Sequence, residues 1–204
     1  MPEGFSDAER ERIRDGLLAT GRDLFSRHGL GKTTIADLTD EVGIAPSTFY
    51  QFFDSKADLY LEVLELEGSS IMDRVLDASF ERHDDPERAI AAFLHTLVDE
   101  MESNRFVRRL LTEQDELDRL RNAVGEDGRA QSRRESLAYI RPYVRNWYEN
   151  GQLRGPDPET ISSAIRAVTM LALHRDDIGE THYGETMDLV IDAVAAGLAE
   201  PDGE

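Results

Sequence analysis

Cysteine and long apolar runs are both missing from this sequence of 204 residues. The lack of cysteine excludes disulfides, Cys-ligated zinc and thiol catalysis. No run reaches the roughly eighteen apolar residues of a membrane-spanning helix. Residues 1–16 also lack the basic-then-apolar order of a secretory signal. We therefore expect a soluble, cytoplasmic protein.

Lysine is almost absent as well. Of the 23 basic residues only Lys32 and Lys56 are lysine, which leaves 21 arginines, and 42 Asp and Glu bring the formal net charge to -19. Excess carboxylate with scarce lysine resembles proteins of halophilic organisms, whose carboxylate-rich surfaces stay hydrated in concentrated salt. The alternative is an ordinary acidic protein. The composition favours a halophilic source.

The charge is unevenly distributed along the chain. Residues 1–60 hold 11 acidic and 7 basic side chains, a net charge of -4, and the remaining 31 acidic and 16 basic side chains give residues 61–204 a net charge of -15. The first segment is therefore less repulsive to a phosphate backbone than the second.

Helical patterns dominate the chain. Apolar residues recur at three- and four-residue steps and strand signals are nearly absent, so the predicted fold class is all-α. A capping box formed by Ser6 and Glu9 marks the first helix, and Gly29 ends it. The pattern predicts helices at 6–28, 34–41, 46–53, 55–80, 86–103, 105–122, 130–151, 158–175 and 183–199. A rough domain boundary falls near residue 60, inside a helix.

Residues 33–56 have the pattern of a helix-turn-helix. Leu38 and Val42 share one face of the first short helix, and Gly43 supplies the residue that tolerates positive φ at a sharp turn. Pro46 suits the first turn of the next helix, where its missing N–H would be unpaired anyway. The turn between two short helices is thus predicted at Gly43.

The second short helix has an apolar and a polar face. Phe49, Phe52 and Phe53 stand at i, i+3 and i+4 and should point inward together. The opposite arc exposes short hydroxyls, a phenol and an amide, from Ser47, Thr48, Tyr50 and Gln51. Such groups donate to phosphate oxygens or read base edges in a major groove.

The stretch "TTIADLTDEVGIAPSTFYQFFDSKADLYLEVL", preceded by "LFSRHGLGKTT", resembles the tetracycline-repressor (TetR) family of transcriptional regulators. The resemblance covers residues 6 to about 64. It implies a DNA-binding domain at 1–60 and a helical effector-binding and dimerisation domain at 61–204. The family pattern is a repressor that binds a palindromic double-stranded DNA operator as a homodimer and is released by a small-molecule effector.

Family roles can be carried over position by position. The resemblance implies phosphate contacts from Thr34, Thr48, Tyr50 and Lys56. It implies base approach from Pro46, Ser47 and Gln51, with Ala36 facing the groove from the preceding helix. Gln51 is the best candidate reader, because its amide can pair with N6 and N7 of adenine.

Each of these contacts has a structural alternative. Thr34 could be only an N-cap, with Asp37 as its capping-box partner. Tyr50 could merely pack on the first helix, and Lys56 could be a solvated surface lysine.

Three positions depart from the family pattern. Thr39 and Val42 replace common alanines where the short helices approach closely. Ala45 stands where a serine or threonine normally caps the recognition helix, and a missing cap costs about 1 kcal/mol. These departures alter the packing but leave the groups that would face DNA.

The acidic remainder offers weaker signals. Large side chains that could line an effector pocket are Phe93, His95, Met101, Phe106, Tyr139, Tyr143 and Trp147, although each could equally be an ordinary core residue. The turn from His174 to His182 has metal-ligating residue types, but it lies in a chain already rich in Asp, so we expect no metal and no other cofactor.

The resemblance implies dimerisation through the last two long helices, 158–175 and 183–199. Apolar residues such as Val168, Met187 and Ile191 form stripes there, which could instead close the core of the monomer.

Two other functions remain to be weighed against a repressor. An enzyme finds little support, because the sequence has no glycine-rich phosphate loop, no H-E-x-x-H and no nucleophile elbow. An interaction or sensor protein that kept the fold but lost DNA binding is the stronger alternative, suggested by Ala45 and by the acidity.

Overall fold

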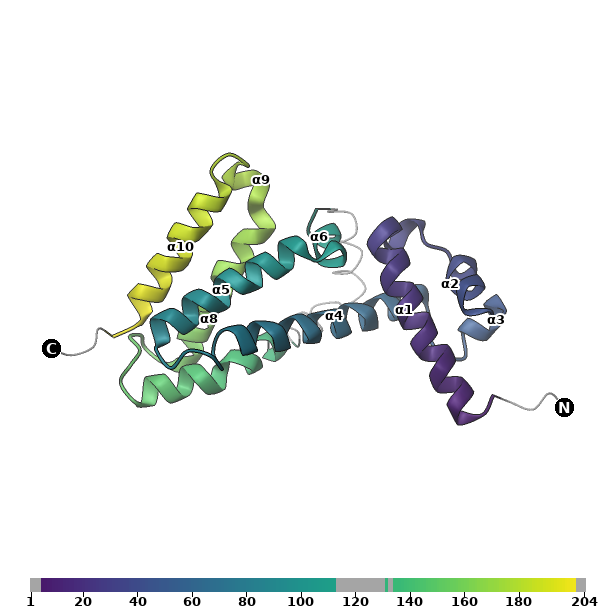
Figure 1. Ribbon diagram of the computed structural model, residues 1–204, viewed down its shortest axis with the longest axis horizontal. Helices are drawn as coiled ribbons and strands as arrows, with labels where there is room; N and C mark the ends of the chain where they lie inside the picture. Colours follow the sequence, from purple (N-terminus) through teal and green to yellow (C-terminus); the bar gives the residue numbers. More distant parts are fainter. Residues whose placement is uncertain (1–4, 113–130, 132–133, 201–204) are drawn as a thin grey trace. The chain divides into compact units, whose positions relative to one another are not determined.

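The computed structural model describes residues 5–112, 131 and 134–200. Within these residues the chain is helical and has no named strand, which confirms the all-α prediction; an isolated antiparallel bridge joins Leu153 and Ala199. None of the described helices is long and apolar enough to span a membrane. The helices are α1 (Asp7–Lys32), α2 (Ile35–Val42), α3 (Pro46–Phe49), α4 (Lys56–Ala78), α5 (Pro86–Ser103), α6 (Arg105–Thr112), α8 (Pro158–Leu171), η1 (Ala172–His174), α9 (Arg175–Ile178) and α10 (Tyr183–Leu198), together with residues 134–149 (Figure 1).

The described residues divide into two compact units. The first unit runs to Ser69 and resumes at Asn104 with α6, and the second comprises Ser70–Ser103 and the described residues from 131 onward. Helix α4 therefore begins in the first unit and ends in the second. A functional boundary at residue 60 stays a prediction.

The first unit is built around the apolar face of α1. Figure 1 shows α2 and α3 beside this helix. Ile13, Leu17 and Phe25 recur at helical spacing on α1 and are buried against side chains of the following helices. The Phe25 and Tyr60 ring centroids lie 4.9 Å apart, and those of Tyr60 and Phe106 lie 5.0 Å apart. One aromatic stack thus joins α1, α4 and α6.

The turn between α2 and α3 has the backbone that its glycine predicts. Gly43 adopts φ 75° and ψ 35°, in the left-handed region. Its N–H donates to the carbonyls of Asp40 and Thr39, and the next N–H, that of Ile44, donates to Thr39 at 3.0 Å. These bonds satisfy carbonyls at the end of α2 and turn the chain into α3.

Two predicted boundaries in the first unit need correction. Helix α1 continues to Lys32, although Gly29 interrupts it with φ 75° and ψ 172°. Helix α3 ends at Phe49 instead of residue 53. Beyond it the N–H groups of Gln51 and Phe52 bond three residues back, to Thr48 and Phe49, so the segment continues as tight turns.

The second unit packs α10 against α5 and α8. Buried residues from these helices include Ile90, Leu94, Ile165, Ile191 and Ala195. Asp157 caps α8 by accepting from the N–H of Thr160 at 2.9 Å. The predicted helix 158–175 is α-helical only to Leu171, after which the chain tightens into η1 before α9.

Candidate nucleic-acid interface

The recognition segment, residues 46–53, has an apolar inner side and a polar outer face. Phe49 is 0 % exposed and Phe53 is also buried in the core of the first unit, as predicted. The outer face consists of Pro46, Ser47, Tyr50 and Gln51, which are all exposed, with the tyrosine 58 % exposed; Thr48 is half-buried beside it.

Phe52 departs from the predicted arrangement. It is only half-buried at the edge of the core, with its ring centroid 6.4 Å from that of Phe5. The helical spacing of i and i+3 no longer applies, because α3 has already ended at Phe49.

The N-cap that was the structural alternative for Thr34 is present. Its Oγ1 accepts from the N–H of Asp37 at 3.1 Å, and its own N–H donates to the Asp37 carboxylate at 2.8 Å. The hydroxyl also donates to that carboxylate at 2.7 Å. These bonds, from the side chain first and the backbone second, lower the pKa of Asp37. Thr34 and Ala36 are both exposed, at the start of α2.

Lys56 connects the two ends of the helix-turn-helix region. It is half-buried, and its Nζ donates to the carbonyl oxygen of Thr33, which follows α1. Lys56 is therefore more than a solvated surface residue. An ammonium group has three donors, so this bond does not by itself prevent a phosphate contact.

Two arginines of α1 hold the end of the recognition segment. Arg10 donates from Nη2 to the carbonyl oxygen of Gln51 at 3.4 Å, and its Cζ lies 5.2 Å from the centroid of the Phe52 ring. The Cζ of Arg14 lies 5.4 Å from the Phe53 ring centroid. Sequence reasoning missed both residues. The two arginines stand four residues apart, which places them on one face of the helix. That spacing does not show that the recognition segment is their partner.

The three departures from the family pattern have clear packing consequences. Thr39 is buried and donates its hydroxyl proton to the carbonyl of Ile35 at 2.9 Å. Val42 faces Gly16 of α1, where an added Cβ would lie 3.3 Å from Cγ1 of the valine. Glycine at position 16 thus makes room for the larger residue. Ala45 makes no side-chain cap bond, as predicted.

Several cations of the first unit bind the protein's own carboxylates. Arg14 Nη2 lies 2.6 Å from Oε2 of Glu62. Arg22 Nη2 donates to Glu67 Oε2 at 3.2 Å, and Arg27 pairs with Asp23 at 2.9 Å. Asn104 also donates to Glu67, at 2.9 Å, which satisfies this buried carboxylate from a second side.

Comparison with known protein families gives a match to the helix-turn-helix region. Residues 17–63 match the family model described as "Bacterial regulatory proteins, tetR family". This stretch is similar to the N-terminal domain of TetR-family regulators. It contains α2, α3 and the whole recognition segment.

Curated relatives and solved structures agree with this match. The HTH-type transcriptional regulator AcrR of Shigella flexneri is 29% identical over 106 residues, which cover 52% of this chain and 48% of that protein. The chain spans about half the length of the curated relatives it matches.

Structural similarity extends over nearly the whole chain. A TetR-family transcriptional regulator of Pectobacterium atrosepticum has a TM-score of 0.71 at 21% identity, covering 97% of this chain and 100% of the other. SmeT, described as the repressor of the Stenotrophomonas maltophilia multidrug efflux pump SmeDEF, has a TM-score of 0.65 at 20% identity, covering 92% and 90%. At such identities the likeness shows the shared fold.

In the second unit, some of the predicted pocket residues lie close together. Phe93, Tyr143 and Trp147 surround Phe80, with ring centroids 4.9, 5.0 and 5.5 Å from it. Burial, with Glu81 beside the phenol, raises the pKa of Tyr143.

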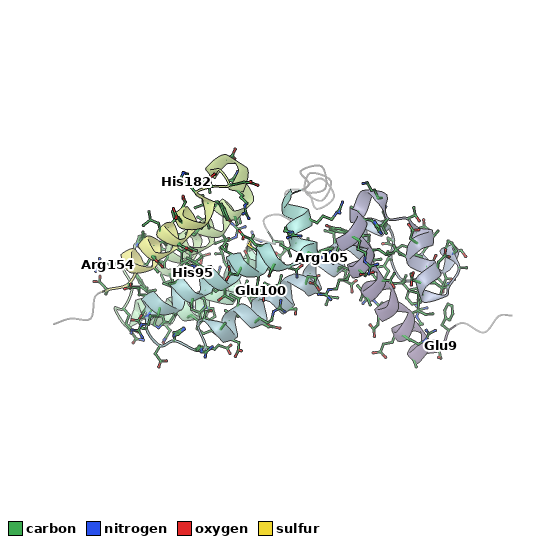
Figure 2. All side chains as sticks on the ribbon, turned by 45° about the horizontal axis from the view of Figure 1, so that its top comes forward. Glu9, His95, Glu100, Arg105, Arg154 and His182 are labelled. Carbon is green, nitrogen blue, oxygen red and sulfur yellow. The ribbon has the colours of Figure 1, made fainter. Side chains whose placement is uncertain are left out.

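The remaining predicted pocket residues lie apart from this aromatic cluster. His95 extends from α5 to α10, where its ring nitrogens lie 3.5 and 3.4 Å from Asp188 and Asp192 (Figure 2). Met101 is half-buried near the end of α5, and Tyr139 is exposed. Phe106 belongs to the core of the first unit. The seven residues therefore do not form one group.

The turn between His174 and His182 contains a local pair. Nδ1 of His174 lies 3.1 Å from Oδ2 of Asp177. Among the side chains that the structure describes, no group of three or more His, Cys, Asp or Glu residues is arranged to hold a metal.

The apolar stripes of α8 and α10 are largely internal. Val168, Met187 and Ile191 are buried in the second unit, so for these residues the monomer-core alternative is correct. The exposed residues of the same helices are mostly small, and Leu189 stands out among them as 70 % exposed. Ala164, Ala167, Ala193 and Ala196 are exposed as well.

The capping box of α2 can be tested by titration. Thr34→Val removes the hydroxyl that donates to Asp37, so the pKa of Asp37 should rise toward its ordinary value. NMR titration of the Asp37 carboxyl carbon measures this, with Asp157 as the internal control, because this N-cap of α8 also accepts from a threonine hydroxyl, that of Thr160. Because the wild-type pKa is lowered, the stabilising effect of this bond should be present above the ordinary aspartate pKa of about 3.9 and lost as the pH falls through the lower folded value. An unchanged titration of Asp37 would contradict the bond.

Proposed function

We propose that this protein is a sequence-specific, DNA-binding transcriptional regulator, a repressor that binds a palindromic operator as a homodimer and is released by a small-molecule effector. The observation that carries the proposal is the outer face of the recognition segment within a TetR N-terminal domain. Buried Phe49 and Phe53 support its role as a fixed reading surface. The described function of SmeT supports repression as the mode of action.

The outer face has the chemistry for a major groove. Tyr50 can donate to phosphate oxygens, Ser47 can reach a base edge, and the amide of Gln51 can form two hydrogen bonds to adenine. Further proposed phosphate contacts come from Thr48, Thr34 and Lys56. The hydroxyl of Thr34 already donates to Asp37, so a phosphate would have to share it or replace that bond. Pro46 and Ala36 complete the proposed surface as small apolar groups near base edges.

The effector would bind in the second unit. The cluster of Phe93, Tyr143 and Trp147 around Phe80 is the proposed starting point for that site, since aromatic side chains line most small-molecule pockets. Met101, His95 and the exposed Tyr139 lie apart from it. An effector that binds one arrangement of the dimer better than another would shift the population away from the DNA-binding form.

A TetR-fold interaction or sensor protein without DNA binding is the second candidate. The net charge of -4 in residues 1–60 and the uncapped α3 favour it. The same binding experiment separates the two functions.

Selection of fragments from the protein's own genome, followed by affinity measurement on the selected site, tests DNA binding. We expect Gln51→Ala to weaken binding to the selected site by about 1–3 kcal/mol while leaving binding to unrelated DNA nearly unchanged. Gln152→Ala, which alters an exposed glutamine in the second unit, is the matched control and should bind like the wild type. Failure to select any sequence at any KCl concentration would refute the repressor and favour the second candidate.

The homodimer is proposed to form through the exposed faces of α8 and α10. Leu189 and the neighbouring alanines let two copies approach closely and bury apolar surface. The half-sites of a palindrome lie in successive major grooves, about 34–36 Å apart or somewhat more, so each copy of a two-fold dimer would read one half-site.

Leu189→Glu should convert the dimer to a monomer. Two leucines lose burial worth about 1.5–3 kcal/mol each, so the dimer dissociation constant should rise at least about 100-fold. Leu66→Glu is the matched control, because Leu66 is 52 % exposed on α4. Analytical ultracentrifugation measures both variants. A monomeric wild type, or equal effects of the two substitutions, would argue against this interface.

The composition supports one further part of the proposal, which is operation in concentrated salt. With 23 basic side chains against 42 carboxylates, the chain is poorly suited to attract phosphate at low salt. In about 1 M salt the Debye length falls to about 3 Å, which screens repulsion between the acidic second unit and DNA. The KCl dependence of DNA affinity tests this part.

A further inference from the structure

The backbone around the candidate reader Gln51 has little helical support of its own. Helix α3 has four residues and no side-chain cap, and Gln51 lies in the turns that follow it. No backbone N–H within residues 5–112 donates to the carbonyl of Gln51. A single helical turn is not stable by itself in water, so the position of this residue must be set by contacts from outside the segment.

Arg10 of α1 supplies such contacts. Its Nη2 donates to the Gln51 carbonyl oxygen at 3.4 Å while its Cζ lies 5.2 Å from the centroid of the Phe52 ring. The ring of Phe5, immediately before the cap residue of α1, lies 6.4 Å from the same phenylalanine. The Arg10 side chain therefore contacts two consecutive residues of the recognition segment, Gln51 and Phe52.

The start of α1 is itself fixed, which makes it a suitable support. Ser6 Oγ accepts from the N–H of Glu9 at 3.3 Å, and the Glu9 carboxylate accepts from the N–H of Ser6 at 3.0 Å. Glu9 lies in this first turn (Figure 2). The N–H of Arg10 then donates to the carbonyl of Ser6 at 2.9 Å. The backbone of Arg10 is thus anchored one residue beyond a closed capping box.

We propose that Arg10 is a positioning residue for DNA reading, which fixes the backbone of Gln51 from α1 without contacting a base itself. The inference rests on the proposed function. A planar guanidinium can stack on a ring and donate in its plane at the same time, whereas an ammonium group cannot reproduce this geometry. Base recognition by an amide requires placement to about 0.5 Å, so a loosened Gln51 backbone would reduce discrimination between sequences.

A direct phosphate contact by Arg10 makes different predictions. It would strengthen binding to all DNA alike and add to the salt dependence. Arg12, which is exposed two residues further along α1, provides a control that removes the same charge.

The DNA experiment compares Arg10→Gln, Arg10→Lys and Arg12→Gln with the wild type, on a selected site and on unrelated DNA. In both Arg10 variants we expect the ratio of the affinity for the selected site to the affinity for unrelated DNA to fall about tenfold. This is the combined effect of losing one hydrogen bond and one cation–π contact. The slope of affinity against KCl should not change, and in a Gln51→Ala background the substitution should cause no further loss. Arg12→Gln should keep the ratio.

Equal weakening on both DNAs with a salt slope reduced by about one would assign Arg10 to phosphate and overturn the proposal. An unchanged ratio in both Arg10 variants would also overturn it. If the wild type itself selects no sequence, the proposed DNA-binding function is refuted, whatever the Arg10 variants do.

Amide hydrogen exchange of the DNA-free protein tests the positioning step independently of any DNA. The N–H groups of Gln51, Phe52 and Phe53 should exchange about tenfold faster in Arg10→Gln, because the same two contacts are lost. The N–H groups of helix α1 should exchange at the wild-type rate in Arg10→Gln, and all of these N–H groups should do so in Arg12→Gln. Equal exchange in Arg10→Gln and the wild type would refute the role of Arg10 whether or not the protein binds DNA.

Discussion

The recognition segment depends on the burial of Phe49 and Phe53. Helix α3 is one turn long and has no cap, so its own hydrogen bonds cannot hold it in place. The two rings, with centroids 5.8 Å apart, anchor it in the core of the first unit, and Gly43 sets the angle at which it leaves α2. The polar groups of the outer face, from Pro46 to Gln51, lie on or next to the turn that these anchors hold.

The cations of the first unit are largely engaged in holding this arrangement. Arg10 and Arg14 lie over rings of the recognition segment, and Lys56 binds the carbonyl that follows α1. Arg22 reaches a buried carboxylate on α4. Under the proposed function, a segment with this distribution of charge would approach DNA mainly with neutral donors. That requirement fits a chain in which carboxylates outnumber basic side chains and in which attraction over long distances is weak.

Local chemistry explains which features the sequence could predict. The capping box at Ser6, the left-handed Gly43 and the inward Phe49 depend on residues no more than four positions apart, and all three were predicted. The capping box at Thr34, equally local, was named as an alternative to a phosphate contact. The contact of Arg10 with Gln51 joins positions 41 apart, and helical spacing cannot reveal it.

Periodicity also has a limit within single elements. It identified apolar faces on α8 and α10 but could not say that Val168, Met187 and Ile191 are covered by the same unit. It carried α3 through to residue 53, because apolar spacing does not show where a helix gives way to turns. The space at Gly16 that accepts Val42 depends on how closely two helices approach, which no local rule describes.

The slope of log affinity against log KCl concentration on a selected operator tests most directly whether neutral donors carry the recognition. Each neutralised phosphate contributes about -0.9 to this slope, so our account predicts a slope shallower than about -4 for the dimer, with sequence-selective binding retained in about 1 M KCl. A slope steeper than about -4, with selective binding lost on adding salt, would contradict this account. It would show that binding depends mainly on lysine and arginine contacts with phosphate.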